Sequence, residues 1–100
     1  MVNFFRLSMV LAIILGGSAA YAADGAAVFE KGCAMCHASG VAGAPKLGDA
    51  DAWGERAKQG VDVLVSSALN GKGAMPPKGV CAGCSDDEVR SAVEYMLSQI

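Results

Sequence analysis

The sequence predicts an all-α domain, and three observations lead to this prediction. Residues 85–88, "SDDE", form a capping box typical of a helix start, and apolar residues then recur at helical spacing up to Ile100. Asp24 is a good N-cap for a first helix that carries Val28 and Phe29 on one face. The segments around "GCAMCH" lack the apolar–polar alternation typical of strands. We therefore expect two amphipathic helices that pack against each other.

These two helices have complementary surfaces. Gly25 and Phe29 are four residues apart, so a smooth patch lies beside an aromatic ring on one helical face. Tyr95, on the last helix, is the residue that we expect to cross over Gly25 and pack near Phe29.

The middle of the chain predicts two shorter helices joined by loops. Residues 39–50, "SGVAGAPKLGDA", are rich in glycine and proline and read as a loop. Residues 49–59 predict a short helix that carries Trp53 and is capped by Asp49 or Asp51. Residues 60–69, "GVDVLVSSAL", predict a second short helix, although their valines also permit a strand. Residues 71–84, "GKGAMPPKGVCAGC", are expected to be a loop because the prolines exclude a helix interior and a central strand.

The N-terminal 22 residues have the pattern of a secretory signal peptide. Residues 1–6 carry one positive charge, residues 7–15 are apolar, and the small residues end in "AYA" at positions 20–22. We expect cleavage after Ala22 and a single exported domain over residues 23–100. The alternative is a retained membrane anchor, but the apolar run is barely long enough to span a bilayer and is interrupted by Gly16 and Gly17.

The expected mature domain is small and slightly acidic. Its 78 residues contain seven basic and ten acidic residues, which leaves a net charge of −3. No basic stripe with interleaved aromatic residues is present, so we do not expect nucleic acid as a partner. A hydrophobic core is thin at this size, and such domains usually need a covalent or metal staple. Four cysteines and a single histidine are the available material.

The first candidate site is the motif Cys33-Ala-Met-Cys36-His37. In a helical turn, positions i, i+3 and i+4 share one face, so both thiols and the imidazole lie on the same side of the backbone. A flat ligand attached through two sulfurs, with a central metal bound by the nitrogen, suits this arrangement. The motif therefore predicts one covalent haem c, held by thioether bonds from Cys33 and Cys36, with His37 as the proximal iron ligand.

Three other uses of these cysteines are disfavoured. A zinc site would use Cys33, Cys36, Cys81 and Cys84, but the gap between the pairs is much longer than the roughly 15–20 residues of common zinc spacings. A thioredoxin-like redox motif requires a βαβ context, which the sequence does not predict. A plain disulfide would leave His37, the single histidine, without a role.

Met75 is the residue that we expect on the opposite side of the haem iron. A six-coordinate iron needs a second axial ligand, and methionine is the suitable residue type left in the expected mature chain. Met35 is too close to His37 to reach the other haem face, and Met96 fits the apolar pattern of the last helix. Pro76 and Pro77 restrict the loop after Met75, which lowers the entropy cost of presenting its sulfur.

Cys81 and Cys84 form a second Cys-x-x-Cys. In an exported protein we expect two nearby unligated cysteines to be oxidised, which would pin the end of the Met75 loop to the start of the last helix. A catalytic Cys-x-x-Cys is the alternative, but no neighbouring histidine is available to lower a thiol pKa.

Four motifs together resemble one family, the class I c-type cytochromes, and are most similar to the bacterial cytochrome c5 group. They are "CAMCH", "GAPKLG", "ALNGKGAMPPKG" and "CAGCSDDEV", and the resemblance covers the expected mature chain. It implies crossed N- and C-terminal helices, His/Met ligation, and a disulfide between Cys81 and Cys84. It also implies that the carbonyl of Pro45 accepts the proximal imidazole N–H and that Leu47 packs on the haem. Trp53 is expected either to bond a haem propionate or to fill the core.

The predicted site fits a periplasmic electron carrier, because two filled axial positions leave none for a substrate. Partners would be a redox donor and an acceptor oxidase or reductase, for which Lys31, Lys46, Lys72 and Lys78 are expected to form a basic edge around the haem. Ordinary solvated lysines are the competing interpretation. A haem sensor or peroxidase-like protein with a displaceable Met75, and a haem subunit that works within a larger complex, are the alternative functions.

Overall fold

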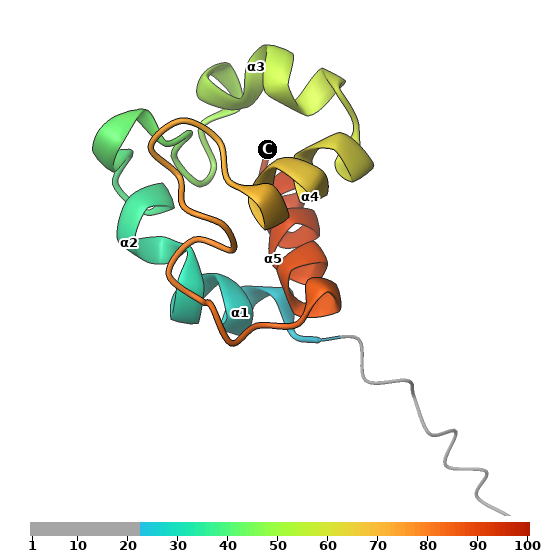
Figure 1. Cartoon of the computed structure of the whole chain (residues 1–100). Coiled ribbons are helices and arrows are strands. Elements are labelled where there is room, and N and C mark those ends of the chain that lie inside the picture. Colours follow the sequence, from blue (N-terminus) through green and yellow to red (C-terminus); the bar gives the residue numbers. More distant parts are fainter. Residues whose placement is uncertain (1–22) are drawn as a thin grey trace, which may run out of the picture.

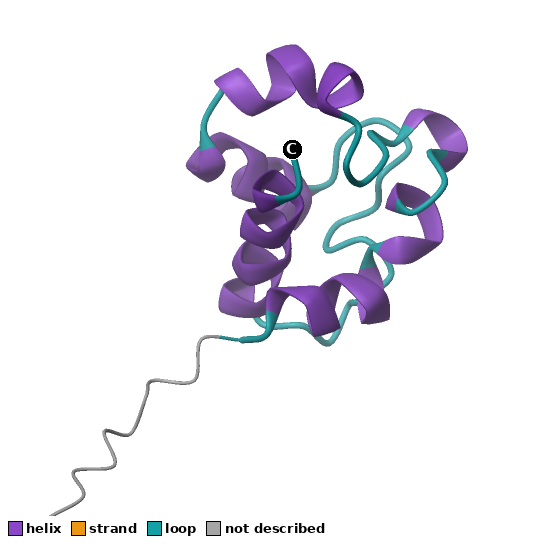
Figure 2. Cartoon of the chain, turned by 180° about the vertical axis from the view of Figure 1, so that it is seen from behind, coloured by secondary structure: helices purple, strands orange, loops and turns teal. Residues whose placement is uncertain are grey.

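The structure, a computed structural model, describes residues 23–100, so the predicted signal peptide and its cleavage after Ala22 lie outside the described residues. The regular elements formed by these residues are helices joined by loops, which confirms the all-α prediction (Figures 1 and 2). Over this range one isolated bridge, between Lys72 and Met75, is the sole β-type pairing, and no helix is both long and apolar enough to cross a bilayer. The elements in chain order are α1 (Gly25–Gly32), α2 (Ala34–His37), the 3₁₀ turn η1 (Val41–Gly43), α3 (Ala50–Lys58), α4 (Val61–Asn70) and α5 (Asp86–Ser98).

The helix starts follow the capping signals in the sequence. The Asp24 carboxylate accepts hydrogen bonds from the first turn of α1, and Ser85 and Glu88 form the predicted capping box of α5. Asp49, rather than Asp51, caps α3. Residues 61–70 adopt the helix and not the strand, and α4 is bounded by Gly60 and Gly71, whose φ values of 89° and 84° favour glycine.

The first and last helices cross at the predicted contact. A Cβ atom on Gly25 would lie 2.2 Å from the Ser91 carbonyl oxygen and 2.9 Å from the Tyr95 Cβ, so the backbones approach as closely as they do because residue 25 lacks a side chain. The rings of Phe29 and Tyr95 lie beside this crossing, 5.5 Å apart at 54°. The prediction for these three residues is therefore confirmed.

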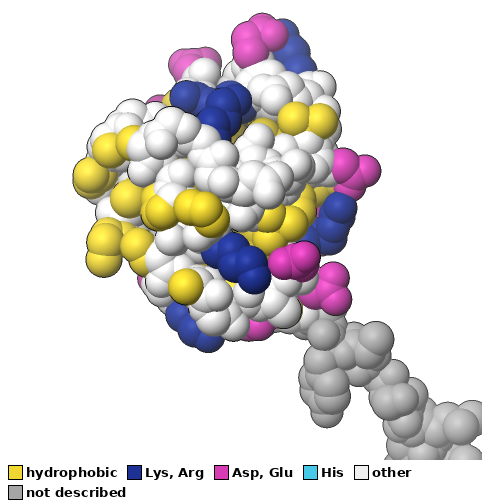
Figure 3. All heavy atoms as spheres, in the orientation of Figure 1, with side chains coloured by type: hydrophobic (Ala, Val, Ile, Leu, Met, Phe, Trp, Pro, Cys, Tyr) yellow, Lys and Arg dark blue, Asp and Glu magenta, His cyan; other side chains and the backbone are white. Residues whose placement is uncertain are grey.

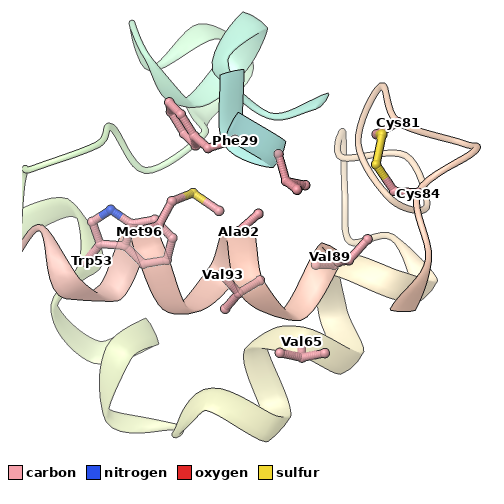
Figure 4. Packing of buried hydrophobic residues seen from close by; sticks show 11 residues of the cluster. Phe29, Trp53, Val65, Cys81, Cys84, Val89, Ala92, Val93 and Met96 are labelled. Carbon is pink, nitrogen blue, oxygen red and sulfur yellow. A yellow bond between two sulfur atoms is a disulfide. The ribbon is translucent and has the colours of Figure 1, made fainter. Parts of the chain in front are cut away.

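The hydrophobic core lies around α5 (Figure 4). Phe29 reaches it from α1, Val65 from α4, and Trp53 from α3, while the buried Cys81–Cys84 pair closes one end. The buried face of α5 presents Val89, Ala92, Val93 and Met96. Helices α1 and α4 thus pack against two sides of the last helix, and α2 and the loop of residues 71–84 are left to line the cavity described below (Figure 1).

Candidate functional site

A cavity of about 360 Å³ lies between α2 and the loop of residues 71–84. This volume falls within the range of small-molecule and cofactor sites, about 300–1,000 Å³. All four residues of the predicted haem site line the cavity, although they come from two segments far apart in the sequence: the α2 segment, with Cys33, Cys36 and His37, and the loop of residues 71–84, with Met75. These two segments are called the two walls of the cavity. Most of the remaining lining is apolar and includes Val41, Ala42, Ala44, Pro45, Trp53, Leu64, Ala68, Ala74, Pro76, Val80, Val93 and Met96.

The α2 wall is built by a short-range turn. The chain kinks at Cys33, between α1 and α2, and the Cys33 carbonyl then accepts from the backbone N–H of Cys36 (3.3 Å) and of His37 (3.0 Å). This turn brings Cys33, Cys36 and His37 to the same cavity. Cys33 and Cys36 are half-buried and do not form a disulfide. Burial raises the pKa of the Cys33 thiol, which disfavours the thiolate that disulfide exchange or zinc binding would require.

His37 is oriented by hydrogen bonds to the loop that follows it. Its imidazole is 8% exposed, and its Nδ1 lies 2.8 Å from the carbonyl oxygen of Pro45. A carbonyl can only accept, so the proton is on Nδ1, and Nε2 keeps its lone pair. The backbone N–H of Leu47 donates to the His37 carbonyl oxygen at 2.7 Å and fixes the same loop. A buried imidazole with this tautomer has the donor atom that an iron ligand requires.

Trp53 and Leu47 differ in their relation to the cavity. The Trp53 indole lines it, is 4% exposed, and stacks at 6.0 Å and 20° on the His37 ring. Its Nε1–H donates to the carbonyl oxygen of Lys46 at 3.1 Å, so this donor is engaged within the protein. Leu47 is partly buried against the core and is not among the cavity-lining residues. Its contact with the haem remains a prediction.

The wall formed by the loop of residues 71–84 contains a tight turn that presents Met75. The backbone N–H of Lys72 donates to the Met75 carbonyl oxygen at 3.0 Å, and the Met75 N–H donates to the Lys72 carbonyl oxygen at 2.9 Å. Gly73 adopts a φ of 56° within this turn. Met75 is half-buried and lines the cavity. Met35 and Met96 line it as well, but Met35 projects from α2 with 71% exposure, and Met96 is 4% exposed within the core of α5.

The loop of residues 71–84 is tied to the rest of the protein by bonds between residues distant in sequence. The Lys78 backbone N–H donates to the Ala68 carbonyl oxygen at 2.7 Å, and the Val80 N–H donates to the Gly32 carbonyl oxygen at 3.0 Å. A Cβ atom on Gly79, where φ is 63°, would lie 2.6 Å from that same Gly32 oxygen. The loop therefore runs closely along the end of α1, as Figure 1 shows for its orange segment.

Cys81 and Cys84 form a disulfide bond at the end of this loop. Both are buried, and a Cβ atom on Gly32 would lie 2.3 Å from the Cys81 Cβ, so the missing side chain of Gly32 leaves the space for the disulfide. Over residues 23–100 no group of three or more His, Cys, Asp or Glu side chains is placed to hold a metal ion. The four cysteines thus do not converge on a zinc site.

The rim of the cavity is apolar and carries positive charge. Met35, Val41 and Val80 are 71%, 53% and 50% exposed, and all three line the cavity. Arg56 and Lys72 also line it, whereas no Asp or Glu of the described chain does. Figure 3 shows hydrophobic side chains gathered on this face. Sequence reasoning missed Val41, Val80 and Arg56, because the rim is assembled from three separate segments.

Of the four lysines predicted to form the basic edge, Lys72 lines the cavity, as does Arg56. Lys31 and Lys46 are exposed but lie outside its lining. Lys78 is turned inward: its Nζ lies 2.7 Å from the Cys84 carbonyl oxygen and 3.4 Å from Asp86 Oδ1. The sequence could not show this, because the partners of Lys78 depend on how the disulfide turn folds back.

Comparison with known proteins identifies the family. The family model for cytochrome c oxidase, cbb3-type, subunit III matches residues 20–96. A cytochrome c5 from Ectopseudomonas mendocina is 51% identical over 83 residues, which cover 81% of this chain and 92% of the relative. The chain belongs to the class I c-type cytochromes.

Two further proteins are similar to this cytochrome, and their matches cover different shares of its chain. A cytochrome c-555 from Chlorobaculum tepidum is 43% identical and covers 99% of this chain and 98% of its own. A chain in the crystal structure of an electron transfer complex of nitrite reductase with cytochrome c superposes with a TM-score of 0.72 and 47% identity, over 76% of this chain and 93% of that one. The cytochrome therefore carries one covalent haem c, and the cavity offers the thiols, imidazole and thioether that this group needs.

Proposed function

We propose that this cytochrome is a periplasmic electron carrier, with Cys33 and Cys36 as the thioether attachment sites and His37 and Met75 as the iron ligands. The single observation that carries the proposal is the cavity that has His37 on one wall and Met75 on the other. The haem supplies a one-electron iron couple when bound. The chain holds, orients and shields this group.

The surroundings of His37 orient it for iron ligation. The Pro45 carbonyl holds the proton on Nδ1, which leaves the Nε2 lone pair as the donor. The Trp53 ring lies nearly parallel to the imidazole, with the ring centroids 6.0 Å apart, and Trp53 is itself fixed by its bond to the Lys46 carbonyl. A ligand held in this way need not rearrange between oxidation states, which favours rapid electron transfer.

Met75 completes the site from the other side. Its thioether is a soft donor that favours ferrous iron, so ligation by Met75 raises the reduction potential. The turn between Lys72 and Met75 and the ring constraints of Pro76 and Pro77 limit how far the sulfur can move. With both axial positions filled, the chain has no open site for a substrate.

The cavity also lacks the groups that a peroxidase-like enzyme would need. Among its lining residues, the titratable side chains are Cys33, Cys36, His37, Arg56 and Lys72, and the described chain places no second histidine or carboxylate there. An acid–base pair for cleaving a bound peroxide is therefore missing from the lining. This supports a carrier over the enzyme alternative.

The rim supports docking to redox proteins that have an acidic surface. Exposed apolar side chains at Met35, Val41 and Val80 can exclude water from an interface, and Arg56 and Lys72 add positive charge beside them. The expected mature domain has a negative net charge, so the positive charge of this face is opposite in sign to the net charge of the domain. A charge asymmetry of this kind orients the cytochrome during encounter with a donor or acceptor. The similar cytochrome c was crystallised in an electron transfer complex with nitrite reductase, which supports a redox protein as the class of partner.

The periplasmic location rests on the signal-peptide pattern of residues 1–22. Fractionation of cells that express the full chain tests it. We expect a haem-stained protein of the mature size in the periplasmic fraction, whereas a full-length species in the membrane fraction would favour a retained anchor.

The carrier function is tested with the purified holoprotein. We expect a reversible one-electron titration between the oxidised and reduced forms, and no turnover of hydrogen peroxide with an added electron donor. Sustained peroxide turnover would overturn the carrier proposal in favour of the peroxidase-like one.

The docking face is tested by electron transfer to a redox protein with a known acidic surface. We expect the rate to fall as ionic strength rises, and Arg56→Gln and Lys72→Gln to lower the rate at low salt. Lys58→Gln is the matched control, because Lys58 is exposed, pairs with Glu55 and does not line the cavity. Equal rates for all three variants would contradict this docking face.

A further inference from the structure

We propose that Lys78 is a positioning residue that fixes the Met75 loop on its wall of the cavity. This inference rests on the proposed ligation by Met75 and deepens it, because it names the residue that sets how firmly the sulfur is held. The observations concern the backbone of Lys78, its side chain, and the short segment that joins it to Met75.

The backbone of Lys78 has a conformation that is uncommon for a residue with a side chain. Its φ is 62°, in the left-handed region where glycine is favoured. Its N–H donates to the Ala68 carbonyl oxygen near the end of α4 at 2.7 Å, and its own carbonyl accepts from the Cys81 N–H at 3.1 Å. A glycine at position 78 would adopt this backbone at a lower cost, so the presence of lysine indicates that the side chain is used.

The side chain of Lys78 connects the loop to two further elements. Its Nζ donates to the Cys84 carbonyl oxygen at 2.7 Å and lies 3.4 Å from Asp86 Oδ1, in the first turn of α5. The Lys78 side chain is 28% exposed, whereas that of Asp86 is 75% exposed. Lys78 thus links α4, the disulfide turn and α5, and its bond to the carbonyl is charge-assisted.

The segment that joins Lys78 to Met75 has little conformational freedom. Pro76 and Pro77 lie between the two residues and have fixed φ angles, and the Gly79 N–H donates to the Pro76 carbonyl oxygen at 3.0 Å. A segment with so little freedom transmits the position of Lys78 to Met75. Loss of the side-chain anchor should therefore loosen the methionine wall while leaving the His37 wall in place.

Lys72 provides a matched control on the other flank of Met75. It is exposed, lines the cavity, and forms no ion pair in the described part of the chain. Lys72→Gln and Lys78→Gln remove the same charge from the two flanks of Met75. Both can shift the reduction potential by electrostatics, so the potential does not discriminate between them.

The test is a titration of the ferric holoproteins with imidazole, which competes with a methionine ligand. We expect imidazole to bind Lys78→Gln about tenfold more tightly than wild type, since a hydrogen bond from a charged group is lost. Lys72→Gln should change the affinity by less than about twofold. Lys78→Arg, which keeps a charged donor, should stay nearer to wild type than Lys78→Gln.

Several results would overturn the inference. Equal affinities for Lys78→Gln and Lys72→Gln would do so, as would a lower unfolding midpoint of Lys78→Gln with no change in imidazole binding. If Lys78→Gln does not accumulate, Lys78→Gly serves instead, because glycine adopts the φ of 62° at a lower cost and still removes the side chain: tighter imidazole binding supports the inference, and unchanged binding refutes it. A wild-type ferric spectrum without a sulfur-to-iron band would refute Met75 ligation itself. This failure of the proposed function is distinguishable from a failure of the Lys78 inference, because it is seen in the wild-type protein.

Discussion

The two walls of the cavity are held in different ways. The wall with Cys33, Cys36 and His37 comes from one kinked helical segment, and its hydrogen bonds are made within that turn and to Pro45 and Leu47 in the loop that follows. The Met75 wall is a loop with bonds to Ala68 on α4, Gly32 on α1 and the disulfide turn. One wall is therefore fixed by residues close in sequence, and the other also by contacts with distant segments.

This difference separates two requirements of an electron carrier. In the proposed carrier, the wall with Cys33, Cys36 and His37 holds the cofactor by covalent bonds and the proximal ligand. The methionine wall must hold a sulfur at a constant position in both oxidation states, and its tethers determine how well it does so. Substitutions on the two walls should consequently have different outcomes.

The largest effect is expected for His37→Ala. Outer-shell partners of a metal ligand are themselves worth about 10–100-fold in affinity, so loss of the ligand should lower the yield of haem-loaded protein by at least about tenfold. The measurement is the ratio of haem absorbance to protein after purification. A wild-type yield with an unchanged spectrum would show that His37 is not the proximal ligand.

On the other wall, we expect Met75→Leu to leave a folded, haem-loaded protein whose ferrous form binds carbon monoxide stoichiometrically. Its reduction potential should fall, because the soft sulfur donor is lost. Met96→Leu is the control: it also replaces a cavity-lining methionine, but one that is buried in the core, and it should leave carbon monoxide binding absent. Carbon monoxide binding by Met96→Leu but not by Met75→Leu would indicate that Met96 is the ligand.

Phe29→Ala tests the core on which both walls depend. The ring is 1% exposed and packs against Tyr95, so we expect a loss of about 3–5 kcal/mol in the free energy of unfolding. Val63→Ala, at a side chain that is 46% exposed, should change it by less than about 0.5 kcal/mol. Denaturant unfolding of the two holoproteins gives the comparison, and equal losses would contradict the packing described.

Gly32→Ala acts where the two walls meet. The added Cβ would lie 2.3 Å from the Cys81 Cβ, so the disulfide turn must shift, and we expect a loss of about 1–3 kcal/mol in the free energy of unfolding. Gly83→Ala is the matched control in the disulfide turn, where nothing lies within 4 Å of the added Cβ, and should cost less than about 0.5 kcal/mol. A loss for Gly83→Ala as large as that for Gly32→Ala would show that the close approach of Gly32 is not the cause.

The smallest effect is expected at the start of α5, where the loop wall ends. Ser85→Ala removes the N-cap oxygen and should lower the free energy of unfolding, measured by heat or denaturant, by about 1 kcal/mol.

The Ser85 backbone N–H donates to the Glu88 carboxylate and, with the Ser85 side chain, lowers the Glu88 pKa below its ordinary value. A lowered folded pKa stabilises the protein above the ordinary glutamate value, about 4.3, and this stabilisation is lost as pH falls through the folded pKa.

The pH dependence of stability tests whether the Glu88 carboxylate is the source of this stabilisation. The stability difference between wild type and Glu88→Gln should be largest at neutral pH and should shrink below about pH 4. A difference that is constant from pH 7 to pH 3 would exclude the capping carboxylate as its source.

Much of the fold was predictable because its signals are local. Asp24 and Ser85 mark the two helix starts, Gly25 and Phe29 specify the crossing with Tyr95, and the spacing of the cysteines and His37 sets one wall of the cavity. The helix over residues 61–70 was ambiguous, because its valines suit a strand when considered alone and packing on α5 decides otherwise.

The rest depended on contacts between distant segments. Lys78 was expected on the docking edge, but its ammonium group turns toward Cys84 and Asp86 because the disulfide turn folds back over it. Arg56 lines the cavity although nothing in the sequence of its own helix distinguishes it from other exposed basic residues. Trp53 was expected to bond a haem propionate or to fill the core. Its indole is part of the core, and its N–H donates to the Lys46 carbonyl oxygen, a bond that depends on the geometry of the loop around Lys46.

The central claim is that His37 and Met75 close the site from its two walls. The most direct test is an optical spectrum of the purified wild-type protein, recorded oxidised, reduced, and reduced under carbon monoxide. We expect a c-type haem spectrum with the weak sulfur-to-ferric-iron band and no change under carbon monoxide. Ready binding of carbon monoxide together with a missing sulfur band would contradict the claim and favour a sensor or peroxidase-like protein.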